Sequence, residues 1–149
     1  MNYTDFLARK KNTKIKAGFT PIIHHTRMFP FQAKIVTTAL EAGRFAIFAD
    51  CGLGKTIMQL EWAAEVVKHT SKNVLILCPL AVAGQTRKEA DKFQIPINGI
   101  DIINYEQLEN VDCSKYAGVV LDESSILKNY EGAYRNMIID MFAKTPYKL

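Results

Sequence analysis

The sequence has no long apolar run, and this absence excludes a membrane-spanning helix. None of its hydrophobic stretches approaches the roughly 20 residues that a bilayer requires, although 48% of the 149 residues are hydrophobic. Residues 1–18, MNYTDFLARKKNTKIKAG, also lack the continuous apolar segment of a secretory signal. We therefore expect one globular domain in the cytoplasm, with no membrane partner.

Cysteine and excess charge are also scarce. The three cysteines, Cys51, Cys78 and Cys113, are odd in number and far apart, so they fit neither a disulfide framework nor a cysteine zinc site. The net charge of +4 permits a polyanionic partner without requiring one. Residues 9–16, RKKNTKIK, carry much of the excess and either meet nucleic-acid phosphates or form a solvated surface.

The sequence does contain short apolar runs that alternate with amphipathic stretches. The apolar runs predict strands at 45–49, 73–79, 99–105 and 116–123. Helical spacing predicts helices at 29–44, with Gly43 as the C-terminal cap, and at 55–69, 85–93 and 131–144. This order indicates the α/β class, a mostly parallel sheet with helices on both faces. Such sheets bind ligands at the carboxyl ends of their strands.

A glycine-rich loop follows the first predicted strand, in the segment ADCGLGKT at residues 49–56. Gly52 and Gly54 allow backbone N–H groups to turn inward, and the following helix adds its positive N-terminal end. Lys55 is suited to reach β- and γ-phosphates, and the Thr56 hydroxyl is suited to ligate Mg²⁺. The segment matches a P-loop except for Ala49, which stands where the first glycine is usual; the alternative is a plain strand-to-helix turn.

An acidic pair follows the fourth predicted strand, in AGVVLDESS. A P-loop requires a carboxylate partner for its metal ion, and Asp122 is the best candidate, acting through water. The adjacent Glu123 is placed to orient and deprotonate an attacking water. Taken alone, the pair could be only the polar end of a strand; together with Lys55 it predicts nucleotide hydrolysis.

The order of several segments resembles the first RecA-like domain of superfamily-two helicases and translocases, particularly the Swi/Snf-type and phage-encoded DEAD/DEAH-box branch. FPFQ is similar to the Q motif, ADCGLGKT to motif I, LILCPLAVAGQ to motif Ia, INYEQL to a later single-strand contact and LDESSILKN to motif II. The resemblance extends from Phe29 to Leu149 and leaves residues 1–28 as a basic leader. It implies a RecA-like P-loop NTPase in the cytosol of a bacterial or phage-infected cell.

The resemblance also implies roles for individual residues. Gln32 would hydrogen-bond adenine and so select ATP, because an amide both donates and accepts. The nucleotide would further contact the loop and helix start, namely Gly52, Leu53, Gly54, Lys55, Thr56 and Ile57. Lys55, Asp122 and Glu123 would be catalytic, with Thr56 and Asp122 at Mg²⁺. Nucleic acid would contact Pro79, Leu80, Asn104 and Tyr105, where phosphate contacts position the protein without specifying sequence.

Two further expectations concern partners and completeness. The ILKN continuation of motif II, with Lys128 and Asn129, favours double-stranded DNA as the track, whereas Ser125 stands where many relatives carry a coupling histidine. The chain stops before motif III, so residues 147–149 would only begin a central strand, and a second RecA-like domain is absent. Isolated turnover should therefore be weak, because relatives take arginine fingers from that domain. The alternative is a catalytically weak nucleic-acid or protein binding module.

Overall fold

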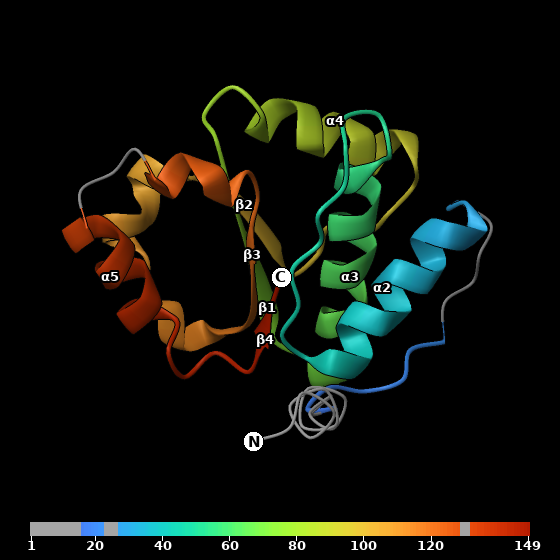
Figure 1. Ribbon diagram of the computed structural model, residues 1–149, viewed down its shortest axis with the longest axis horizontal. Helices are drawn as coiled ribbons and strands as arrows, with labels where there is room; N and C mark the ends of the chain where they lie inside the picture. Colours follow the sequence, from blue (N-terminus) through green and yellow to red (C-terminus); the bar gives the residue numbers. More distant parts are fainter. Residues whose placement is uncertain (1–15, 23–26, 129–131) are drawn as a thin grey trace, which may run out of the picture.

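The computed structural model of the protein describes residues 16–22, 27–128 and 132–149. Most of the predicted basic leader, and Asn129, lie outside these ranges. Within them, four strands form one parallel sheet in the order β2-β1-β3-β4 (Figure 1). The predicted α/β class is confirmed. The strands are β1 (Asn73–Cys78), β2 (Ile100–Asn104), β3 (Tyr116–Leu121) and β4 (Tyr147–Lys148).

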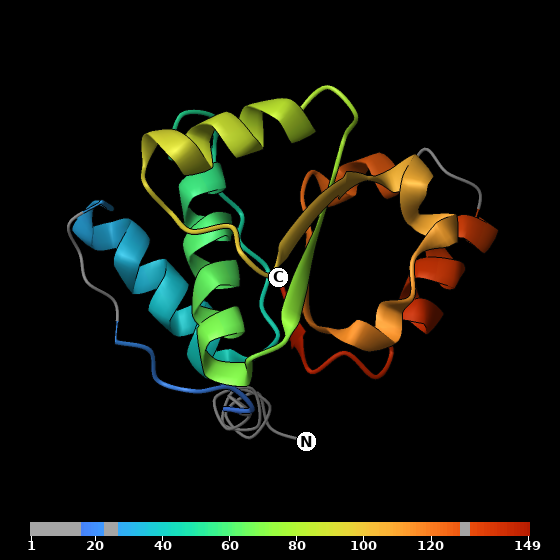
Figure 2. The same cartoon turned by 180° about the vertical axis from the view of Figure 1, so that it is seen from behind.

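Helices cover both faces of the sheet (Figures 1 and 2). On one face lie α2 (Pro30–Ala42), α3 (Lys55–Thr70) and α4 (Ala83–Lys92); on the other lie the 3-10 helix η1 (Tyr105–Asn110) and α5 (Gly132–Met141). Two short 3-10 helices, η2 (Cys113–Lys115) and η3 (Ser124–Lys128), flank β3. In the described ranges, no helix has the length and apolar character needed to cross a membrane.

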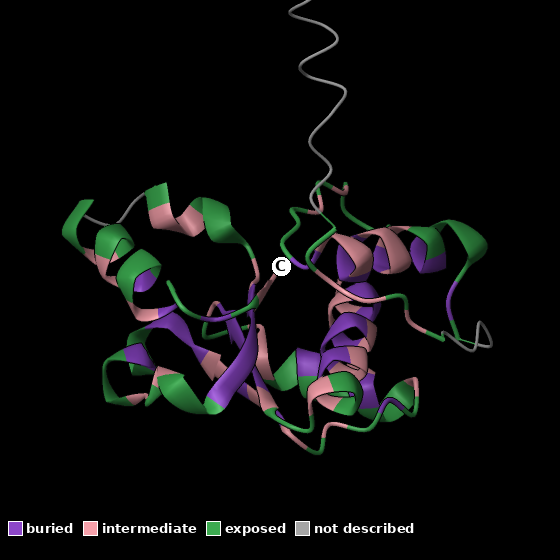
Figure 3. Ribbon diagram, turned by 90° about the horizontal axis from the view of Figure 1, so that it is seen from below, coloured by how far each residue is buried: buried purple, intermediate pink, exposed green. Residues whose placement is uncertain are grey.

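Each face of the sheet has its own hydrophobic core. Alternate residues of β1 point to opposite faces, so Val74 and Ile76 join α2 and α3 whereas Leu75 and Leu77 join η1 and α5. Trp62 of α3 is fully buried in the first core. Figure 3 shows buried residues concentrated on the strands and on the helix faces turned towards them. Burial on both faces explains the continuous apolar runs in the sequence.

The packed part of the chain includes residues before Phe29. The backbone N–H groups of Gly18 and Phe19 donate to the carbonyls of Glu41 and Leu40 at the end of α2. A Cβ atom at Gly18 would lie 1.7 Å from the Leu40 carbonyl oxygen, so glycine is required for this approach. Part of the predicted leader therefore docks on the domain. Helix α2 itself ends where predicted, at Gly43, whose φ of 76° closes the cap.

The prediction of a strand at residues 45–49 is wrong: in the structure this segment is a loop that forms no strand. The residue before it, Arg44, forms an isolated parallel bridge with Lys148, and the Phe45 N–H donates to the Lys148 carbonyl. Phe48 is 96% exposed, although the prediction made it a buried strand residue. The physical reason is that β4 lies between β3 and residues 43–45 and has only two residues, so residues 46–49 have no strand beside them.

We predict that Gly118→Val destabilises the fold by about 1–3 kcal/mol, because it overpacks the contact between β3 and α3. A Cβ atom at Gly118 would lie 3.2 Å from methyl groups of Val66 and Val74 and 3.4 Å from the Trp62 ring. Urea unfolding measures the loss. The control is Gly84→Ala in α4, where a Cβ meets nothing within 4 Å and stability should be unchanged or slightly higher. Equal stability of the two variants would contradict the packing argument.

Candidate active site

The loop before α3 has the backbone conformation of a turn that only glycine adopts easily. Gly52 and Gly54 have φ values of 82° and 77°, in the left-handed region. At Gly54 a Cβ atom would also lie 2.3 Å from Nε2 of Gln32. The first N–H groups of a helix have no helical acceptor, and the N-cap Gly54 has no side chain to cap them, so those of α3 are available for an anion.

Gln32 lies against this loop and is only 5% exposed. Its Nε2 donates to the Leu53 carbonyl at 2.9 Å, and its Oε1 accepts from the Phe29 N–H at 2.9 Å. Gln32 was predicted to contact adenine; in the structure its amide joins the start of α2 to the glycine loop. Nearby, the Phe29 and Phe31 rings stack 6.1 Å apart between centroids and are partly exposed.

The first residues of α3 have different environments. Lys55 extends towards the end of β3, where its Nζ lies 3.3 Å from Oε1 of Glu123. The hydrogen bond to Glu123 raises the pKa of Lys55, so the ammonium form is favoured. Thr56 is half-buried, but Ile57 is only 4% exposed and packs in the core. The side chain of Ile57 therefore offers little surface to a nucleotide.

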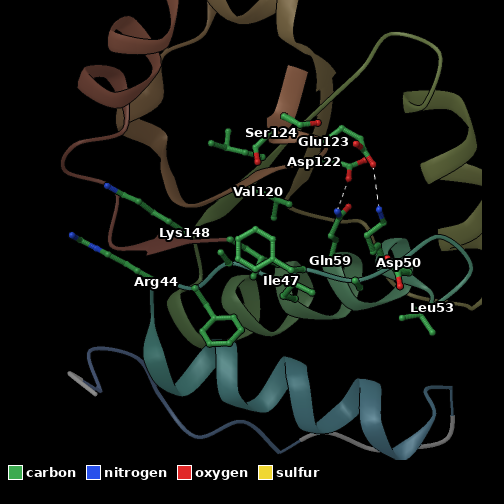
Figure 4. Close-up of a pocket in the computed structure, with 18 residues that line it drawn as sticks. Arg44, Ile47, Asp50, Leu53, Gln59, Val120, Asp122, Glu123, Ser124 and Lys148 are labelled. Carbon is green, nitrogen blue, oxygen red and sulfur yellow. Dashed lines mark hydrogen bonds and ion pairs between the residues drawn. The ribbon is translucent and has the colours of Figure 1, made fainter. Parts of the chain in front are cut away.

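Gln59 is a site residue that the motifs did not identify. Its Nε2 donates to Oδ1 of Asp122 at 2.7 Å, across the space between α3 and β3 (Figure 4). Gln59 follows Lys55 by four residues, so both side chains leave the same face of the helix. That spacing is the one sequence signal for Gln59. The lysine and the glutamine thus contact the two consecutive carboxylates of Glu123 and Asp122.

The acidic pair occupies a tight turn at the carboxyl end of β3. The Asp122 N–H donates to the Leu77 carbonyl at 2.8 Å, which holds the residue beside β1. Glu123 has a φ of 51°, a left-handed conformation that is uncommon for a residue with a side chain. Its carbonyl accepts from the Ile126 N–H at 2.9 Å within η3. This turn brings Glu123 back towards Lys55.

A cavity of about 730 Å³ lies between the end of β3 and the segment that precedes α3 (Figure 4). One wall is the end of β3 with Asp122 and Glu123, and the other is the segment before the glycine loop together with Lys55 and Gln59. Its lining residues are 44–50, 53, 55, 59, 120–125, 148 and 149. The cavity therefore combines a polar end near the acidic pair with an apolar trough beside β3.

The donor set fits a cation that retains phosphate and water ligands. In the part of the chain that the structure describes, no three His, Cys, Asp or Glu side chains gather to form a metal site. Mg²⁺ is usually held by one or two carboxylates plus phosphate oxygens and water, which a single Asp122 carboxylate can support. Thr56, in the first turn of the helix that also carries Gln59, bears a hydroxyl oxygen as well.

The four residues predicted to contact nucleic acid separate into two groups. All lie at the carboxyl ends of the neighbouring strands β1 and β2. Leu80 is 67% exposed and Pro79 is half-buried beside it. Asn104 and Tyr105 are 8% and 2% exposed. The Asn104 side chain accepts from the Gln107 N–H at 3.0 Å and so caps η1, and the Tyr105 hydroxyl donates to the Asp122 carbonyl. These two side chains have almost no surface to offer a ligand.

This backbone arrangement matches that of a solved structure. The fold is that of a RecA-like helicase domain. It is similar to the crystal structure of the UvsW helicase from bacteriophage T4, with a TM-score of 0.72, 14% sequence identity and 99% of this chain covered. The matched part is 58% of the length of that chain. No protein-family model and no curated protein sequence matches the sequence. The likeness establishes the RecA-like fold that the motifs predicted.

Proposed function

We propose that the protein is the ATP-binding domain of a helicase or translocase of the Swi/Snf-like type, which hydrolyses ATP to move along nucleic acid when it acts with a second RecA-like domain. The observation that carries the proposal is the pairing of Lys55 with Glu123 and of Gln59 with Asp122 in a RecA-like fold. A glycine loop, a lysine and an acidic pair in one cavity are the groups that phosphoryl transfer requires.

Phosphate binding belongs to the start of α3 in this proposal. The free N–H groups of the first helical turn and the positive end of the helix favour an anion. The Lys55 ammonium adds a full charge, and its present partner is an exposed carboxylate that a triphosphate can displace. Gly52, Gly54 and Thr56 would supply backbone donors around the same turn, and Leu53 would join them if its N–H leaves the Asp50 carbonyl, which is 3.4 Å away. The buried side chain of Ile57 anchors the turn in the core.

Hydrolysis belongs to the acidic pair. When Lys55 binds phosphate, the Glu123 carboxylate is released from its ion pair and can accept the proton of an attacking water. Asp122 and Thr56 would hold Mg²⁺, which when bound neutralises charge on the phosphate oxygens. The chain's own contribution is to place one base, one cation-binding carboxylate and one ammonium group in a shared cavity.

Selection of ATP belongs to Gln32. Its amide uses one N–H with Leu53 and one lone pair with Phe29. An amide has two N–H groups and two oxygen lone pairs, so one donor and one acceptor remain. Because Gln32 is only 5% exposed, adenine would reach them after the side chain moves. Because Gln32 also hydrogen-bonds the glycine loop, adenine binding at Gln32 would affect the position of the phosphate-binding loop directly.

In this proposal the loop after β1 contacts nucleic acid, and that nucleic acid is double-stranded DNA. Leu80 is exposed there, and backbone groups beside Pro79 can contact phosphates without specifying sequence. The buried Asn104 and Tyr105 lie at the carboxyl end of the neighbouring strand β2, where they make hydrogen bonds within the protein. Tyr105 connects it to the acidic pair, because its hydroxyl contacts Asp122.

The trough beside β3 is proposed to accept one more extended strand, parallel to β3. The Leu149 N–H donates to Val119 and its carbonyl accepts from Leu121, while Lys148 is bonded to residues 43 and 45 on its other side. Residues 147–149 thus begin a strand between two neighbours, and the cavity continues along the same line. A strand there would pair with residues 46–49 and cover Phe48.

We predict that Lys55→Ala abolishes most of the stabilisation that Mg·ATP gives the protein, because the variant lacks the ammonium that faces the phosphates. A ligand present at 100 times its Kd stabilises a protein by about 2.7 kcal/mol, which a thermal melt detects. The control is Lys88→Ala on the exposed surface of α4, which should respond to Mg·ATP as the parent protein does. Equal stabilisation of Lys55→Ala and the parent would overturn the phosphate site.

We predict that phosphate release is slow for the isolated chain and rises when duplex DNA and a second RecA-like domain are supplied. An arginine finger from such a domain is worth about 10³ to 10⁵ in rate. A colorimetric phosphate assay, with Glu123→Gln as the inactive control, measures this. Duplex DNA that binds without turnover under every condition would instead favour the alternative, a nucleic-acid binding module derived from this fold.

We predict that a short apolar β-forming peptide appended after Leu149 slows hydrogen exchange at the Ile47 amide by about tenfold, since it supplies a ladder partner. The matched control is an appended peptide of equal length with proline at alternate positions, because proline cannot donate ladder hydrogen bonds. Hydrogen exchange followed by NMR gives both rates. If the two extensions leave Ile47 exchanging equally fast, the trough does not accept a strand.

A further inference from the structure

Asp122 is held at three of its four polar atoms. Its N–H donates to the Leu77 carbonyl at 2.8 Å, and its carbonyl accepts from the Tyr105 hydroxyl at 2.8 Å. Its Oδ1 accepts from Nε2 of Gln59 at 2.7 Å. The fourth polar atom of Asp122, Oδ2, has no hydrogen-bond partner among the described residues. The carboxylate is thus fixed in position, with Oδ2 as the oxygen that accepts no hydrogen bond from the described residues.

We infer that Gln59 and Tyr105 are positioning residues, which fix Asp122 so that Oδ2 is the one oxygen offered to a divalent cation or to its bound water. This inference rests on the proposed function. It adds Gln59, which the motifs do not identify, and gives Tyr105 a role other than the nucleic-acid contact that its motif implies. It concerns how Asp122 is aligned and assigns no nucleotide contact to Gln59 or Tyr105.

The chemistry of Gln59 suits this task. An amide N–H is a neutral donor, so it orients the carboxylate without cancelling the negative charge that attracts a cation. A lysine or arginine in its place would neutralise that charge. Gln59 lies four residues after Lys55 and three after Thr56, so one helix face carries the phosphate-binding ammonium, the hydroxyl and the donor to Asp122. Any shift of α3 therefore moves all three together.

Tyr105 holds the same residue from the other layer of the domain. Gln59 belongs to α3, which packs on one face of the sheet, whereas Tyr105 belongs to η1 on the opposite face. Tyr105 is only 2% exposed, and its hydroxyl donates to the Asp122 carbonyl. The Tyr134 hydroxyl of α5 in turn donates to the Tyr105 carbonyl. Asp122, at the carboxyl end of β3, is consequently held by contacts from the helices on both faces of the sheet.

The test is the dependence of nucleotide affinity on Mg²⁺. Nucleotide Kd is measured by fluorescence titration with a labelled ATP analogue, once with Mg²⁺ and once with EDTA, and the ratio gives the metal's contribution. Removing a hydrogen-bond partner of a metal-binding carboxylate typically costs 10- to 100-fold in metal affinity. We expect Gln59→Leu to reduce the Mg²⁺ enhancement at least about tenfold while the affinity in EDTA stays at the parent value.

Two further variants make the result specific. Tyr105→Phe keeps the buried ring and removes only the hydroxyl, so it should reduce the Mg²⁺ enhancement in the same direction. Gln85→Leu, on the exposed face of α4, is the matched control and should behave as the parent protein. Thermal melts of each variant establish that it is folded before its affinities are compared.

The possible results separate the inference from the proposal on which it rests. A parent protein that binds no nucleotide under either condition would overturn the proposed function, and the inference with it. A parent protein with clear Mg²⁺ enhancement, fully retained in Gln59→Leu and Tyr105→Phe, would overturn the inference alone. Equal losses with Mg²⁺ and with EDTA would also overturn it, because they indicate a general disturbance of the pocket rather than loss of alignment at Asp122.

Discussion

The contact between the first turns of α3 and the acidic turn after β3 is the constraint on which the candidate site depends. Lys55 pairs with Glu123, 68 residues later in the chain, and Gln59 pairs with Asp122, 63 residues later. These two polar contacts join α3 to the end of β3. Both are polar interactions in a partly exposed cavity, where each alone contributes little to stability. Their importance is geometric, because they hold an ammonium and two carboxylates within one ligand-sized space.

The rest of the fold supports this contact from two directions. Glycines with positive φ set the start of α3, and Gln32 holds their loop against α2. On the other side, the buried β3 strand ends at Asp122, whose backbone is fixed by β1 and by Tyr105. The sheet is continuous up to β4 and then opens into the trough beside residues 46–49. The site therefore lies at the junction of a well-packed sheet and an edge without a neighbouring strand.

Fold and function rest on different observations. The RecA-like fold follows from the parallel sheet, its covering helices and the likeness to a phage helicase structure. At 14% identity, that likeness transfers no substrate. The proposed ATPase chemistry rests instead on residue types in one cavity: an ammonium, a carboxylate base and a cation-binding carboxylate. Agreement between these two independent lines is what makes an ATP-driven motor domain the best-supported proposal.

The sequence by itself determined most of the elements and the chemical character of the site. Apolar runs predicted β1, β2 and β3, helical spacing predicted α2 to α5, and the glycines with Lys55 located the turn, because these signals are local. Only the tertiary structure decided the features that depend on distant neighbours. Residues 46–49 have strand-like composition yet form no strand, since a ladder requires a partner on the other side of the trough. Tyr105 is buried rather than exposed, and Gln59 reaches Asp122, because helix packing on the sheet sets both distances.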